Sequence, residues 1–175
     1  MKTMVKVLCF AMALMLCTVG MVSCKQTNYA ANNTEFVIGV SGPLTGSAAI
    51  YGTAVANAAQ IAVDEINAAG GLNGVMFKLV AMDDKHDATL VSGNYSAMLE
   101  QGMQVSLGTV TTAPGMVFKN LAKEDNVFFL TPSASGDKIP EFDNGFQMCF
   151  ADGNQGAVAA KYVNGLGLSS IGIFY

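Results

Sequence analysis

Residues 36–46 read FVIGVSGPLTG, a short β-branched run that passes directly into a turn rich in glycine and hydroxyl groups. The run predicts a buried strand, and the turn predicts a loop that leads into a helix. The next stretch, Thr53 to Ala69, is rich in alanine, with apolar side chains recurring at three- and four-residue steps. This spacing predicts a helix, and we expect Gly70 and Gly71 to end it.

The same alternation of strand, loop and helix continues to about Leu130. Further apolar runs predict strands over 77–82, 105–107 and 127–130, and the segments between them predict helices over 88–101 and 114–124. Strands that alternate with helices through short loops predict an α/β fold: a parallel sheet with helices on both faces.

Ligands in such folds bind beyond the carboxyl ends of the strands. The four loops at those ends are 41–52, 83–87, 108–113 and 131–137, and three of them are rich in glycine and hydroxyl groups. Hydroxyls and free N–H groups at a helix start suit a carboxylate, which the positive end of the helix dipole also favours. Serine and threonine are equally common helix caps, and composition alone favours capping.

The first 23 residues predict a secretory signal. Lys2 and Lys6 precede an apolar run over 7–22 that contains no charge and is short for a membrane span. Cys24 follows directly and resembles the cysteine of a bacterial lipobox, which would receive a diacylglycerol anchor. An ordinary signal peptide or a membrane anchor, with Cys24 incidental, is the alternative. Residues 24–35 are polar and predict a solvated tether.

The charge balance argues against a nucleic-acid-binding protein, and the cysteines argue against a disulfide-bonded one. Without the leader, seven lysines and no arginine face thirteen acidic residues, which argues against a partner nucleic acid. Cys149 is the one cysteine left once the leader is removed and Cys24 is acylated, so we expect no intramolecular disulfide. Its apolar neighbours Met148 and Phe150 predict a buried structural thiol rather than a nucleophile.

Neither a metal site nor an active site is expected. His86 is the single histidine, and Asp83, Asp84 and Asp87 around it lack the spacing of a calcium loop, so we interpret them as a solvated acidic loop. Ser41 lacks the glycine two residues later that a nucleophile elbow needs. We therefore expect neither an enzyme nor a cofactor; a hydrolase would need a base and a nucleophile that this pattern does not provide.

Four motifs carry a resemblance to the branched-chain amino acid binding proteins of ABC transporters, which are type I periplasmic binding proteins. They are SGPLTG at 41–46, DEINAAGGLNG at 64–74, TPSAS at 131–135 and NQG at 154–156. The resemblance extends over 36–175 and implies the N-terminal part of a two-lobed protein that closes on its ligand. Residues 36–148 would form the N-terminal lobe, and 149–175 the crossover and a truncated start of the second lobe. A member with so little of its second lobe is expected to bind ligand poorly.

The resemblance also implies a ligand site. The Thr112 hydroxyl would bind the ligand carboxylate, the Ser133 carbonyl and the Ser135 hydroxyl would bind the ammonium group, and Tyr51 would lie near the ligand side chain. Some family members join the second and third of the four loops by a disulfide. The matching positions here are His86 and Thr111, so that covalent brace is missing.

The function implied is capture of a branched-chain or related amino acid, or of a small amide or carboxylate, for an ABC permease. The protein would lie outside the cytoplasm, in the periplasm or at the cell surface, anchored to the membrane by lipid on Cys24. The alternative is a sensor domain of the same fold that binds a similar ligand and signals without transport.

Overall fold

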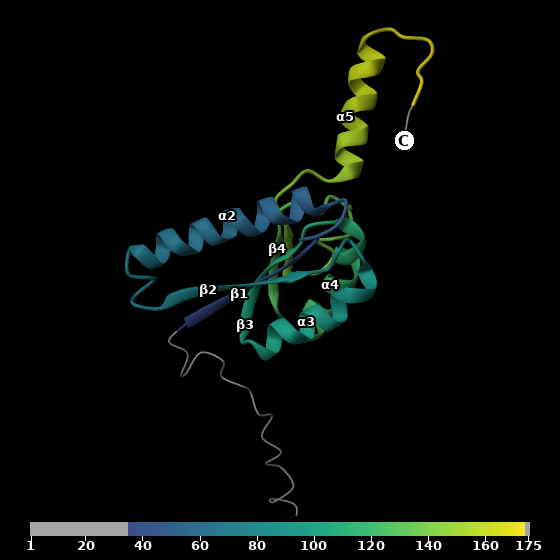
Figure 1. Ribbon diagram of the computed structural model, residues 1–175. Coiled ribbons are helices and arrows are strands. Elements are labelled where there is room, and N and C mark those ends of the chain that lie inside the picture. Colours follow the sequence, from purple (N-terminus) through teal and green to yellow (C-terminus); the bar gives the residue numbers. More distant parts are fainter. Residues whose placement is uncertain (1–34, 174–175) are drawn as a thin grey trace, which may run out of the picture. The chain divides into compact units, whose positions relative to one another are not determined.

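The computed structural model describes residues 35–173, and strands and helices alternate as expected up to residue 131. The elements are β1 (Glu35–Gly42), α2 (Ala49–Ala68), β2 (Met76–Asp83), the 3₁₀ helix η1 (Ala88–Leu90), α3 (Val91–Glu100), β3 (Met103–Thr109), α4 (Thr112–Glu124), β4 (Phe128–Thr131), β5 (Gly145–Gln147) and α5 (Asp152–Gly165). Figure 1 shows their arrangement.

The strands form one parallel sheet in the order β2-β1-β3-β4-β5. From β1 the chain turns to β2 on one side, then crosses β1 to add β3, β4 and β5 on the other side. The direction of winding therefore reverses between β1 and β3. In open α/β sheets this reversal opens a crevice at the carboxyl ends of the two strands.

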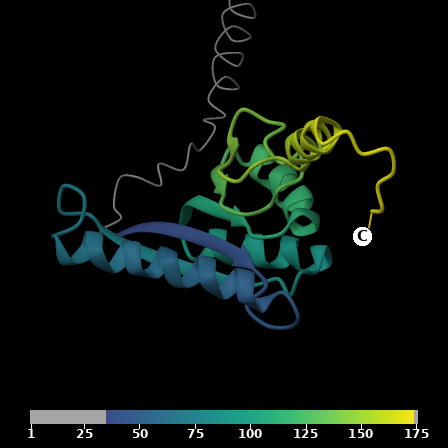
Figure 2. The same ribbon diagram turned by 90° about the horizontal axis from the view of Figure 1, so that it is seen from above.

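Helices cover both faces of the sheet, as predicted. α2 packs on β1 and β2 from one face, whereas α3 and α4 pack on the opposite face (Figures 1 and 2). The main core lies beneath α3 and α4, where Phe118 stacks edge-to-face with Tyr95 at 5.2 Å and with Phe129 at 5.6 Å between ring centroids. Edge-to-face packing of this kind stabilises a core beyond the area it buries.

The face that carries α2 is less completely covered. Within α2 only Gly52 and Val63 are buried. Phe128 and Phe146 lie on neighbouring strands, with ring centroids 5.4 Å apart, and are 46% and 50% exposed. Phe128 alternates with the buried Phe129 along β4, so its ring is on the side of the sheet away from α3 and α4.

Several boundaries differ from the sequence prediction. α2 begins at Ala49 rather than Thr53. α4 begins at Thr112, two residues before Pro114. Proline is tolerated at this third helical position because N–H groups in the first turn lack helical partners. β3 continues through Gly108, whose φ of 60° suits glycine. β5 was not predicted, since its three residues form no apolar run.

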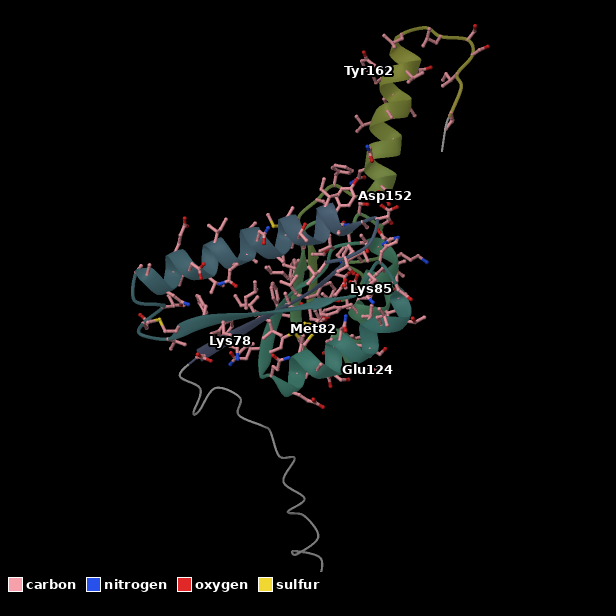
Figure 3. The ribbon with its side chains drawn as sticks, viewed as in Figure 1. Lys78, Met82, Lys85, Glu124, Asp152 and Tyr162 are labelled. Atoms are coloured by element: carbon pink, nitrogen blue, oxygen red, sulfur yellow. The ribbon has the colours of Figure 1, made fainter. Side chains whose placement is uncertain are left out.

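α5 differs from the other α-helices because it buries none of its residues. Tyr162 on this helix is 69% exposed (Figure 3). Residues 171–173, beyond this helix, form no strand. None of the helices within 35–173 has the length and apolarity needed to cross a bilayer.

Candidate functional site

The loops that follow β1, β2, β3 and β4 meet at the carboxyl edge of the sheet, beside the reversal between β1 and β3. Gly42, the last residue of β1, lies against Val110 of the loop after β3. A Cβ atom on Gly42 would come within 2.7 Å of Val110 Cγ2. The absence of a side chain at Gly42 therefore allows the first and third loops to pack closely.

Asp83 holds the loop after β1. Its carboxylate accepts hydrogen bonds from Leu44 N at 2.8 Å, Thr45 Oγ1 at 2.5 Å and Lys85 N at 3.0 Å. Desolvation raises the pKa of Asp83, but these hydrogen bonds outweigh it and leave the pKa below its usual value. The ionised carboxylate thus links the end of β2 to the SGPLTG turn.

Asp84 is fully buried beneath the same loops. One carboxylate oxygen accepts from Ser41 Oγ at 3.1 Å, and the other accepts from His86 N at 3.0 Å. Burial raises the pKa of Asp84 above its usual value, although both hydrogen bonds act in the opposite direction. Ser41 is therefore a buried structural donor within β1, consistent with its exclusion as a nucleophile.

The N-terminus of α4 reaches this edge without a side-chain cap. Thr111 is the N-cap residue, but its hydroxyl makes no hydrogen bond to the first turn of the helix. Oγ1 of Thr111 lies instead 2.9 Å from Nδ1 of His86. The first N–H groups of α4 therefore keep their partial positive charge at the edge of the sheet.

Thr112, the first residue of α4, contacts the loop after β4. Its Oγ1 accepts a hydrogen bond from Gly136 N at 3.2 Å. A Cβ atom on Gly136 would lie 2.5 Å from Thr112 Cγ2, so the close approach requires glycine there. Because a hydroxyl both accepts and donates, Thr112 can still donate its own proton to a bound group.

The loop after β4 carries Ser133 and Ser135, both half-buried, and is held from several sides. Ala134 N donates to Thr131 Oγ1 at 3.1 Å, and Gln147 Nε2 donates to Ala134 O at 2.6 Å. Asp152 N, at the start of α5, donates to Ser135 O at 2.9 Å. This loop is thus tied to β4, β5 and α5.

The predicted ligand residues lie on three elements of the fold. Thr112, Ser133 and Ser135 lie on adjoining loops, which the bond between Gly136 and Thr112 connects. Tyr51 lies in the first turn of α2 and is 60% exposed. Their roles remain predictions, and Cys24 lies outside the described residues.

Sequence reasoning missed Gly136 as a residue that shapes the site. Its position directly after the hydroxyl-rich TPSAS loop was the available signal. Cys149 is half-buried, with Sγ 3.4 Å from Ala134 O. Within the range 35–173, no group of three or more potential metal-binding residues is present.

Comparison with known proteins identifies the family to which the chain is similar. A family model described as "Periplasmic binding protein" matches residues 35–175. The Leu/Ile/Val-binding protein BraC3 of Rhizobium johnstonii is 33% identical over 133 residues, which make up 75% of this chain and 36% of that protein. Leu/Ile/Val-binding protein homolog 3 of Brucella melitensis is 32% identical over 136 residues, covering 77% and 37% respectively.

The chain is also similar to a solved structure. This is the branched-chain amino acid transporter substrate binding protein LivJ of Streptococcus pneumoniae in complex with isoleucine. It shares 31% identity with a TM-score of 0.69, over 74% of this chain and 38% of that chain. The match to one lobe of that structure confirms the predicted α/β fold. The chain thus spans little more than a third of the length of its relatives. Because the family model matches every described residue, the chain belongs to the periplasmic binding protein family.

Proposed function

We propose that the chain supplies the amino-acid-binding lobe of an exported solute-binding protein that serves an ABC importer. Residues 36–148 form the binding lobe in this proposal, and 149–175 form the crossover toward a second lobe. The observation that carries the proposal is the position of Thr112. It begins an uncapped helix at the reversal of the sheet and contacts the loop that holds Ser133 and Ser135.

The chemistry of these two loops suits a zwitterion. The N–H groups at the start of α4 and the Thr112 hydroxyl offer donors and partial positive charge to a carboxylate. The loop after β4 offers hydroxyl and carbonyl oxygens to an ammonium group. Donors and acceptors on adjoining loops can therefore bind the two charged ends of one α-amino acid.

The relatives support a branched-chain or related amino acid as the ligand, because two are Leu/Ile/Val-binding proteins and one was solved with isoleucine. The family comprises binding proteins, which confirms the prediction that the chain is not an enzyme, and it implies an extracytoplasmic location. A sensor without transport remains the alternative. A permease gene beside this one would favour transport.

The test is calorimetric titration of the purified protein with L-leucine, L-isoleucine and L-valine, repeated for Thr112→Ala and Thr112→Ser. A hydrogen bond to a charged group is worth about 1.5–3 kcal/mol, so Thr112→Ala should weaken binding about tenfold to a hundredfold. Thr112→Ser keeps the hydroxyl and should stay close to the parent. Ser133→Ala should matter less than Ser135→Ala, because alanine retains the carbonyl proposed for Ser133.

The structural bond from Gly136 to Thr112 provides the opposing explanation. If Thr112 serves only this bond, Thr112→Ala lowers the melting temperature while the dissociation constants stay unchanged. That result would remove Thr112 from the proposed site. Weak binding by the chain alone is expected, because little of a second lobe is present. No binding of any of the three amino acids by a version that carries a complete second lobe would reject the ligand class.

The proposed lipid anchor has a separate test. A thiol must receive the diacylglycerol, so Cys24→Ser should leave the protein unlipidated and move it from the detergent phase to the aqueous phase. An unchanged detergent fraction would count against the anchor. Cys149→Ser is the matched control, since Cys149 is a free cysteine far along the chain from the proposed lipidation site.

A further inference from the structure

His86 and Thr111 connect two of the loops at the candidate site. Nδ1 of His86 lies 2.9 Å from Oγ1 of Thr111. His86 belongs to the loop after β2, and Thr111 is the N-cap residue of α4, directly before Thr112. The loop after β2 therefore contacts α4 at the residue that fixes where the helix begins.

The loop after β2 holds His86 in an uncommon backbone conformation. Lys85 and His86 have φ values of 52° and 62°, a left-handed region that residues other than glycine rarely adopt. Two adjacent carboxylates hold it, since Asp83 accepts from Lys85 N and Asp84 from His86 N, each at 3.0 Å. Strain of this kind persists only where surrounding contacts enforce it, and it gathers at functional sites.

Thr111 transmits this contact to the first turn of α4 through its backbone. Its carbonyl oxygen accepts from Gly115 N at 3.0 Å, the first bond of the helix, and from Thr109 Oγ1 at 3.3 Å. Its side chain does not cap the helix. A change in the rotation of Thr111 would therefore redirect the N–H groups and the hydroxyl that follow it.

We propose that His86 is a positioning residue for the carboxylate subsite, which it orients through the hydroxyl of Thr111. The inference rests on the proposed function, because the subsite is the one assigned above to Thr112 and the start of α4. His86 makes its side-chain hydrogen bond to Thr111 and none to Thr112, so it acts through its neighbour. The bond is exposed to solvent, which limits the effect to that of one ordinary hydrogen bond.

A double-mutant cycle tests the coupling. His86→Ala removes the imidazole and Thr111→Val removes the hydroxyl at nearly constant shape. Each should raise the dissociation constant for L-isoleucine about twofold to tenfold. The dissociation constant of the double variant should not exceed that of the single variant with the larger dissociation constant, because both changes remove the same bond.

Two further variants separate positioning from general damage. His86→Asn should retain most of the affinity, since its amide places a polar atom where Nδ1 lies and asparagine tolerates positive φ. Lys85→Ala introduces alanine into the same left-handed loop, at a side chain that is exposed. It should leave the dissociation constant unchanged although it can lower the melting temperature.

Amide hydrogen exchange at Gly115, measured without ligand, provides an independent measure. His86→Ala and Thr111→Val should each accelerate exchange at Gly115 about twofold to tenfold, with no further increase in the double variant. If L-isoleucine does not bind a version that carries a complete second lobe, the proposed function fails, while exchange at Gly115 still decides whether His86 orders α4. Additive losses in the cycle, or unchanged exchange at Gly115, would overturn the inference.

Discussion

The amide nitrogen of Gly136 donates to Oγ1 of Thr112 across 3.2 Å and joins the loop after β4 to the first residue of α4. The two residues are 24 positions apart in the sequence. They also touch through carbon, because a Cβ on Gly136 would lie 2.5 Å from Thr112 Cγ2. The separation of the two loops is therefore set by a residue that has no side chain.

The first prediction is that Gly136→Ala weakens amino-acid binding about tenfold or more. The new methyl group cannot fit unless Thr112 or the loop moves, and a displaced hydroxyl loses its charged partner. Gly156→Ala in α5 is the control, because a Cβ there meets nothing within 4 Å. Equal dissociation constants for the two variants in calorimetry would show that the Thr112 contact does not shape the site.

The second prediction concerns pH and the adjacent carboxylates Asp83 and Asp84. Hydrogen bonds lower the pKa of Asp83 despite desolvation, so its stabilising effect is present above the usual value of 3.8 and is lost as pH falls through the folded-state pKa. Asp83→Asn should therefore reduce the free energy of unfolding by about 1 kcal/mol at pH 7. The difference from the parent should shrink below about pH 4.

Asp84 should behave in the opposite way. Burial raises its pKa, so the folded state favours the protonated form, and its contribution to stability falls as pH rises from 3.8 through the folded-state pKa. Asp84→Asn removes a buried charge and keeps an acceptor for His86 N, so at pH 7 it should not destabilise the fold. Denaturant unfolding across pH 3 to 7 checks both variants, and parallel pH profiles would contradict the assignment.

The third prediction concerns the buried Lys119 on α4. Its side chain is 3% exposed, forms an ion pair with Glu141, and Nζ donates to Lys138 O at 2.7 Å. Lys119→Met leaves that carbonyl without its charged donor and should lower the free energy of unfolding by about 1.5–3 kcal/mol.

Lys123→Met is the matched control for Lys119. Lys123 lies on the same helix with Nζ 4.1 Å from the centre of the Phe142 ring, but it is exposed. A cation–π contact at an exposed site is worth about 0.5–1 kcal/mol, so its loss should be smaller. Equal losses in thermal unfolding would mean that burial of Lys119 is not what makes it important.

The fourth prediction is that trypsin cuts the 175-residue chain early at Lys161. This lysine lies in α5, which buries no residue, and a helix of 14 residues without tertiary support is marginally stable. Lys119 is enclosed in the core face of α4 and should be cut only on global unfolding. Mass spectrometry of timed digests checks the order. Protection of Lys161 equal to that of Lys119 would contradict it.

The sequence was sufficient for the alternation of strands and helices, because apolar periodicity and glycine breaks are local signals. It was insufficient for β5, which is three residues long and begins with Gly145. That strand exists because it pairs with β4, where Phe129 is opposite Gly145. A Cβ at position 145 would lie 2.5 Å from the Phe129 ring, so glycine is required there. Glycine has no apolar side chain and therefore gives no pattern from which a strand could be predicted.

The candidate site was predictable only as a set of loops. The rule that ligands bind at the carboxyl ends of parallel strands selected one edge of the sheet, where the four loops lie. The contacts that organise this edge join residues far apart in the sequence, such as His86 with Thr111 and Gly136 with Thr112. No local sequence pattern predicts either pair, because each contact depends on how two loops pack after the sheet has formed.

Cys149 offers a practical handle on the loop after β4. It is the only cysteine within residues 35–173, and its Sγ lies 3.4 Å from the carbonyl oxygen of Ala134, between Ser133 and Ser135. Burial raises the pKa of this thiol, so little thiolate is present at neutral pH while the loop stays packed. The rate at which a thiol reagent labels Cys149 therefore depends on how this loop is packed, and a ligand that holds the loop should slow the labelling without any engineered probe.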